Sequence, residues 1–163
     1  MLVASDLKDA MLASTEQKTD AISANLALGN SISTYLITNT VINFSFSGVN
    51  PVPSTITVPA TGKITLMPIV LVPSIGAIPA MNIAIGLGIM AGIYIPDAPF
   101  VCSPGSMLGF PPTTIVVSGS SRDDAYQMMA DAIVKDMTSF VPTVPCAGNY
   151  GAYVGACTPT GIE

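Results

Sequence analysis

Apolar residues at helical spacing predict a helix near the start of the chain. Leu7 and Met11 share one face over residues 5–28, and Ser5 is placed to cap the first turn. A capping-box sequence over residues 14–17 leaves a break or second start open there. Gly29 and Asn30 predict the end of the helix.

A second helix is expected over residues 122–140. Ser120 or Ser121 can cap it, and Asp123 and Asp124 suit the positive end of its dipole. Asp131 and Lys135 are spaced to pair across one turn. One apolar face is predicted, consisting of Ala125, Met128, Met129, Ala132, Ile133, Met137 and Phe140.

Alternating apolar and polar residues predict strands between these helices. Ile42, Phe44 and Phe46 point one way within residues 40–47, with polar residues between them. Residues 54–58 and 63–67 indicate two further strands joined by a turn at 59–62, and residues 113–117 another. A small, mostly antiparallel sheet accounts for these segments.

Prolines divide the apolar middle of the chain, residues 68–112, into short pieces. The longest stretch free of proline, residues 80–95, favours a short buried helix from Ala80 to about Gly92, with Pro79 at its start. Ala84, Gly88 and Gly92 repeat at helical spacing and would allow close packing. A membrane-active protein inserting residues 64–95 is the alternative, although neither end of that stretch carries the basic and aromatic anchors of a spanning helix.

The expected fold class is therefore α+β, with terminal helices packed on a small, mostly antiparallel sheet and a Pro/Gly-rich apolar middle. The 163 residues suit a single domain over residues 1–145. Residues 146–163, rich in Gly, Ala and Tyr, are expected to form an extended tail.

Charge is distributed unevenly along the chain. Between residues 21 and 121 the only charged residues are Lys63 and Asp97, and charged residues make up 9% of the whole chain. In soluble domains about a quarter of the residues are charged. A segment with so few charges is expected to be buried against protein and not to be surrounded by water. With a net charge of −5 and five basic residues, nucleic-acid binding is not expected.

The residue types give little support for catalysis. The chain has no His, which excludes Ser-His-Asp and Cys-His sites within it. Ser5 and Lys8 match an S-x-x-K spacing, but the motifs that accompany it in serine acylases are missing. Asp123 and Asp124 could bind a cation, but we interpret them as residues that stabilise the start of a helix. We predict no enzyme activity, no cofactor and no metal.

Three cysteines, Cys102, Cys146 and Cys157, are too few and too widely spaced for a structural zinc site. Their odd number, without a secretory signal, argues against a disulfide framework. Buried reduced thiols are expected, with a single bridge between Cys146 and Cys157 as the alternative.

Several stretches resemble small structural proteins of tailed-bacteriophage virions, of the tail, neck or baseplate type. They are LKDAM at 7–11, ISTYLITNTVINFSFSG at 32–48, the Pro/Gly-rich middle and the helix over 125–140. The resemblance implies a non-enzymatic structural role in the virion, with copies of the chain and other virion proteins as partners. It carries over no functional residue.

Assembly would then bury apolar strands and the tail against neighbouring subunits, for instance by strand addition. The predicted subunit contacts are Tyr150, Tyr153 and Val154 in the tail, together with Ile42, Phe44 and Phe46 if the edge of the sheet is shared.

Overall fold

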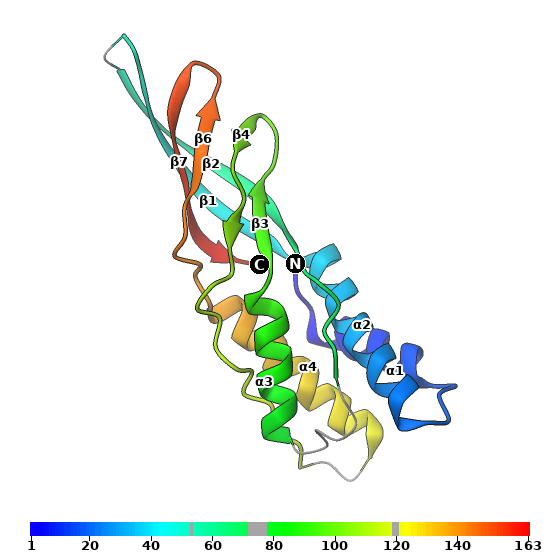
Figure 1. Ribbon diagram of the computed structural model, residues 1–163. Helices are drawn as coiled ribbons and strands as arrows, with labels where there is room; N and C mark the ends of the chain where they lie inside the picture. Colours follow the sequence, from blue (N-terminus) through cyan, green and yellow to red (C-terminus); the bar gives the residue numbers. More distant parts are fainter. Residues whose placement is uncertain (53, 72–77, 119–120) are drawn as a thin grey trace.

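The computed structural model describes residues 1–52, 54–71, 78–118 and 121–163. This described part of the chain is elongated, with a curled sheet at one end and four helices at the other (Figure 1). The predicted α+β class is confirmed. The helices are α1 (Ala4–Thr15), α2 (Ala21–Asn39), α3 (Ile78–Met90) and α4 (Arg122–Ser139). The strands are β1 (Val41–Asn50), β2 (Ser54–Thr65), β3 (Ile93–Pro96), β4 (Phe100–Cys102), β5 (Gly105–Ser106), β6 (Cys146–Tyr150) and β7 (Tyr153–Ile162).

The sheet is antiparallel, with strand order β4-β6-β7-β1-β2-β3-β5. Its central strand is β1, whose alternation is as predicted: Ile42, Phe44 and Phe46 are buried on the concave face. The strand runs on to Asn50 instead of ending at Gly48, because residues 48–50 continue to pair with β2.

The turn predicted at residues 59–62 is wrong, since β2 is one continuous strand through them. Pro59 pairs with Ser45 of β1. The carbonyl of Thr61 accepts a hydrogen bond from the Asp97 amide, so backbone groups at alternate residues from Thr61 point away from β1. Pro59 is one of these residues, and its missing N–H therefore costs no hydrogen bond to β1.

The C-terminal residues belong to the sheet. β7 pairs with β1 on one side and with β6 on the other, and β6 pairs with β4. Glu163 also exchanges backbone hydrogen bonds with Val41. The segment 146–163 is extended, as expected, but it pairs within the chain as β6 and β7 and is not a free tail.

Several predicted boundaries of the first helical region are wrong. The N-cap of α1 is Val3, and the Ser5 hydroxyl donates to Asp6 inside the helix. The second start is capped by Asp20, whose carboxylate accepts a hydrogen bond from the Ser23 amide at 2.8 Å. That bond lowers the pKa of Asp20. The break therefore lies after Thr15, and Ser14 starts no helix.

Gly29 and Asn30 do not stop α2, which continues to Asn39. A Cβ atom at Gly29 would lie 1.9 Å from the Ile69 carbonyl oxygen, so the glycine allows residues 66–71 to pack against the helix. Ser33, one turn further, accepts a hydrogen bond from the Ile69 amide at 2.9 Å. Tertiary packing thus overrides the local stop signal.

The C-terminal helix matches its prediction closely. The Ser121 hydroxyl caps α4 by accepting from the Asp124 amide at 3.1 Å. Met129, Ile133 and Met137 are buried on the predicted face. Asp131 accepts a hydrogen bond from Gln127, and among the described residues only Lys8 forms ion pairs. The predicted pairing of Asp131 with Lys135 is therefore wrong.

Residues 113–117 are not a strand. Their backbone groups are bonded by side chains of two helices instead of by a neighbouring strand. Asn82 of α3 donates to the Ile115 carbonyl at 3.0 Å and accepts from the Ile115 amide at 3.1 Å. Asp136 of α4 accepts from the Thr114 amide at 2.7 Å. This segment therefore fastens α3 and α4 together.

Residues 64–95, considered above for membrane insertion, are divided among the end of β2, the extended residues 66–71, α3 and the start of β3, with residues 72–77 outside the described part. Within the described residues, none of the helices has the length and apolar character needed to cross a bilayer.

Candidate interaction surface

Three of the predicted contact residues lie in the core of the molecule. Ile42, Phe44 and Phe46 are each at most 3% exposed, and β1 is an interior strand. Phe44 packs against Tyr94 with ring centroids 5.7 Å apart, and Phe46 packs against Phe100 at 5.5 Å. The concave face of the sheet is therefore filled by the chain itself. These three residues are not placed to contact another subunit.

The three contact residues predicted near the C-terminus differ in exposure. Tyr150 stacks on Phe100 with centroids 4.8 Å apart and is half-buried. Tyr153 is also half-buried. Val154 is exposed on the opposite, convex face of the sheet. Of the six predicted residues, Val154 alone offers most of its side chain to a partner.

Helix α3 lies between two uncharged segments of its own chain. Gly88 faces Ile69, whose Cγ1 would lie 2.6 Å from a Cβ atom at this position. Gly86 faces Pro112, whose Cα would lie at the same distance from a Cβ atom. Gly88, one of the small residues noted in the sequence, and Gly86 thus allow close packing within the chain, and Ile85 and Ile89 are buried between the two contacts.

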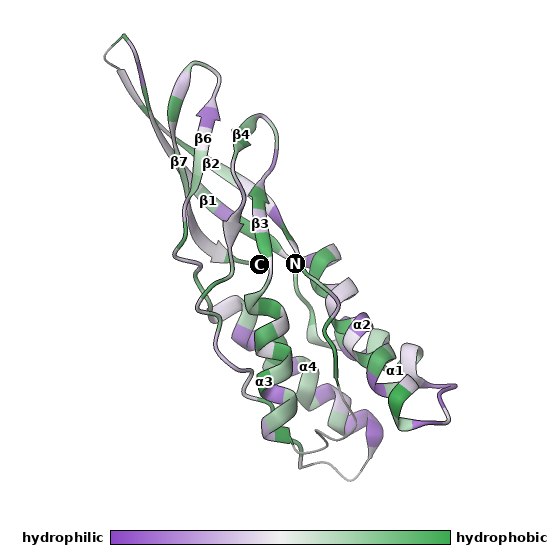
Figure 2. Cartoon of the chain, viewed as in Figure 1, coloured by the Kyte–Doolittle hydropathy of each residue, from purple (hydrophilic) through white to green (hydrophobic). Residues whose placement is uncertain are grey.

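The opposite side of α3 is exposed and apolar. Ile83 and Leu87, four residues apart, are 50% and 53% exposed. We call the α3 face the surface of the helix formed by these two residues. Residues 64–96 and 98–121 contain no charged residue, so neither α3 nor the two segments that flank it carries a charge. Figure 2 shows the apolar colour of α3 in this view.

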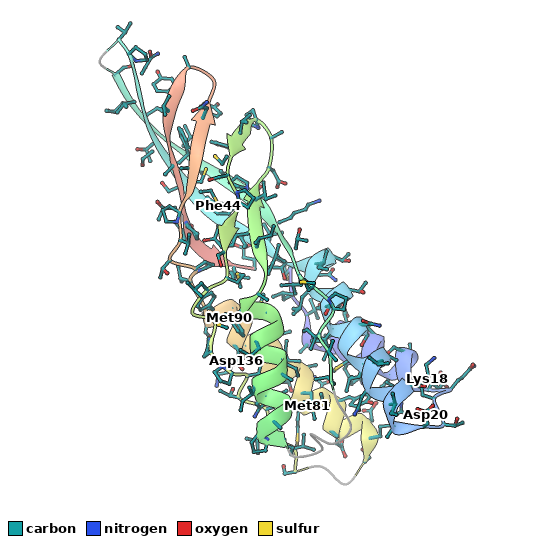
Figure 3. All side chains as sticks on the ribbon, in the orientation of Figure 1. Lys18, Asp20, Phe44, Met81, Met90 and Asp136 are labelled. Atoms are coloured by element: carbon teal, nitrogen blue, oxygen red, sulfur yellow. The ribbon has the colours of Figure 1, made fainter. Side chains whose placement is uncertain are left out.

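The charged side chains of the helical half come from α1, from the turn between α1 and α2 and from α4, whose Asp136 is bonded to Thr114 in a segment that flanks α3. Figure 3 labels Lys18 and Asp20 at the turn between α1 and α2, well away from Met81 and Met90 of α3. Lys8 of α1 lies 3.4 Å from an oxygen of Asp123 at the start of α4. That carboxylate raises the pKa of Lys8. Arg122 donates to the buried hydroxyl of Thr15, which also accepts from Tyr126.

These contacts bear on the candidate catalytic residues. Ser5 donates to Asp6 and the Lys8 ammonium is paired with Asp9 and Asp123, so the S-x-x-K residues do not bond each other. Asp124 accepts from the capping Ser121 hydroxyl at 2.7 Å. Asp124 thus takes part in the cap of α4, whereas Asp123 forms an ion pair with Lys8 of α1.

A shallow cleft of about 670 Å³ lies at the rim of the sheet and holds two further carboxylates. The Asp97 carboxylate accepts a hydrogen bond from the Thr61 hydroxyl at 3.2 Å. The Glu163 carboxylate accepts one from the side-chain amide of Asn43 at 2.8 Å. Searching the described residues finds no group of three or more Cys, Asp or Glu side chains arranged to hold a metal ion.

No protein-family model, curated protein or solved structure matches this chain. The α3 face is thus the candidate that the geometry itself provides. It was not among the contacts predicted from sequence. The spacing of Ile83 and Leu87 within a long stretch without charge was the available signal, but it could not show which side of the helix would be buried.

Proposed function

We propose that this chain is a virion structural protein, a subunit of a multi-copy phage particle assembly of the tail, neck or baseplate type. The observation that carries the proposal is the α3 face, a pair of exposed apolar side chains on a helix that carries no charge. Its partners are copies of the chain and other virion proteins. The resemblance noted in the sequence favours the same role.

The physical argument concerns desolvation. Interfaces that form permanently are more apolar than ordinary surface and are depleted in charged residues at their centres. Burying Ile83 and Leu87 removes apolar area from water, and no charge on the α3 face has to lose its hydration in the process. Because the two side chains are four residues apart, they form a ridge that fits a groove of a neighbouring subunit.

The experiment compares the full chain with a variant carrying Ile83→Asp and Leu87→Asp, using sedimentation velocity over a range of concentrations. The wild-type chain is expected to form multi-subunit species, and the variant to remain monomeric with an unchanged circular dichroism spectrum. Ile22→Asp is the matched control, since Ile22 is an exposed apolar residue of α2 outside the α3 face. Equal assembly by all three proteins would contradict a role for the α3 face.

The assignment to a particle has its own test. Mass spectrometry of purified particles from the virus whose genome encodes the chain is expected to find it in a fixed stoichiometry with known structural proteins. Particles that lack the chain would exclude the virion role, whatever the sedimentation result.

A further inference from the structure

Three thiols converge on the concave face of the sheet, although they are far apart in sequence. Cys102 ends β4, Cys146 begins β6 and Cys157 lies in the middle of β7. Cys146 and Cys157 are directly opposite each other in the register of β6 and β7. The Sγ atoms of Cys102 and Cys157 are 3.9 Å apart, with both cysteines in the free thiol form.

The closeness of Cys102 to Cys157 needs an explanation, because β6 separates their strands. Gly148 of β6 provides it. This residue is the register partner of Cys102, and a Cβ atom on it would lie 2.5 Å from the Cys102 Cα and 2.7 Å from its Sγ. Since glycine places no side chain there, the Cys102 thiol can pass over β6 and reach β7.

The three thiols differ in accessibility. Cys146 and Cys157 are completely buried, whereas Cys102 is half-buried at the end of a short edge strand. Burial raises the pKa of Cys146 to about 11 and that of Cys157 to about 12, so both stay protonated near neutral pH. Cys102 is therefore the thiol that a dissolved reagent can meet first.

We propose that Cys102 and Cys157 form a site for thiol–disulfide exchange with a small disulfide of the glutathione class, closing a bond between β4 and β7. The Cys102 thiolate attacks one sulfur of the small disulfide, forming a mixed disulfide and releasing one thiolate. Cys157 then attacks the Cys102 sulfur, and its proton passes to the departing sulfur, which leaves as the second thiol. The protein loses two electrons and two protons, and the small disulfide is reduced to two thiols.

The bond would act on one edge of the sheet. Strand β4 is an edge strand of three residues, held by its pairing with β6. A covalent link to β7, which lies next to the central β1, would fasten that edge to the middle of the sheet. It would also close a long loop between residues 102 and 157, which restricts the unfolded chain.

The test incubates the fully reduced chain with oxidised glutathione, blocks free thiols, and maps the peptides by mass spectrometry. The wild-type chain and the matched control Cys146→Ser are expected to lose the mass of two hydrogen atoms and to yield a cross-linked peptide pair containing residues 102 and 157. Cys157→Ser is expected to stop at the glutathione adduct on Cys102, and Cys102→Ser to remain unmodified.

The wild-type map decides the outcome even if a variant folds poorly. A bond between Cys146 and Cys157 in the folded wild-type chain would overturn the assignment, as would three free thiols after prolonged incubation. A comparison of thermal unfolding before and after oxidation adds a second readout, with a higher midpoint expected for the cross-linked chain. An unchanged or lower midpoint would contradict the proposed fastening of β4.

Discussion

The concave face of the sheet and the α3 face both draw on the uncharged part of the chain, but only the concave face is covered by other parts of the chain. On the concave face, Phe44, Phe46 and Tyr94 are buried against one another and against β4. On the α3 face, Ile83 and Leu87 keep about half of their surface in solvent. Low charge alone therefore does not tell whether a segment is satisfied within its own fold.

The difference comes from the shape of each partner. Because the sheet curls, aromatic side chains of different strands pack against each other on the concave side. The curl also brings β3, from one half of the sheet, into contact with β4 at the other edge. Helix α3 is covered on three sides, by residues 66–71, by residues 111–115 and by the core, and nothing in the described chain covers the fourth. The two faces thus differ in burial: one belongs to the core, and the other keeps apolar side chains in solvent.

The first prediction tests the closed face. Phe46→Ala removes a completely buried ring that contacts both Phe100 and Tyr150. We expect a loss of about 3–5 kcal/mol in the free energy of unfolding, because a cavity remains where the aromatic cluster cannot collapse. Urea denaturation measures it. Val154→Ala on the convex face of the sheet is the control and should cost far less; equal losses would mean that the concave face is not the core.

The second prediction uses pH on the same face. Burial raises the pKa of Cys146 and Cys157, and that of Tyr94 to about 12, above the values these groups take in the unfolded chain. The unfolded chain then releases protons first as pH rises, so stability is fully present below about pH 9 and is lost progressively toward pH 12. The measurement is urea denaturation under reducing conditions between pH 8 and pH 11.

A matched variant sharpens this pH test. In the double variant Cys146→Ala and Cys157→Ala, two of the three buried acids are gone, so the decline above pH 9 should be shallower than in the wild-type chain, whatever its starting stability. A parallel decline in both proteins would show that the buried thiols do not cause it.

The sequence predicted best those elements whose periodicity is strong and local. The alternation around Phe44 and the capped helix from Arg122 are both present, because local pattern and tertiary packing agree there. The errors occur where a distant contact decides. Gly29 lies within a helix because it packs closely against Ile69. Pro59 lies within a strand because its backbone nitrogen points away from β1, where no N–H is needed for pairing with β1.

The candidate surface could not be obtained from sequence for a related reason. Exposure of Leu87 depends on which side of α3 meets residues 66–71 and 111–115, and apart from Asn82 the helix has no polar side chain to mark its outer side. The thiol cluster was equally hidden. Cys146 and Cys157, named from sequence as the alternative to free thiols, are register partners, but the approach of Cys102 depends on Gly148 and on the curl of the sheet.

The third prediction concerns the attachment of α3 to its flanking segment. Asn82→Ala removes the side chain that bonds both the amide and the carbonyl of Ile115 and accepts from the Thr113 hydroxyl. We expect a loss of about 1–3 kcal/mol, because backbone groups next to the buried Ile115 side chain lose their partners. Hydrogen exchange should show faster exchange of the Ile115 amide. Unchanged exchange there would mean that another group holds this segment.

The smallest effect on stability is expected on the α3 face itself, and two residues of one helix make the comparison. Leu87→Ser changes an exposed side chain and should cost less than about 1 kcal/mol, mainly through helix propensity. Ile85→Ser, two residues earlier, places a hydroxyl in a fully buried position and should cost several-fold more. In sedimentation the order should reverse: Leu87→Ser weakens self-association, while any folded Ile85→Ser chain keeps it. If both residues affect stability equally and association not at all, α3 would be an ordinary surface helix and the contrast with the concave face would disappear.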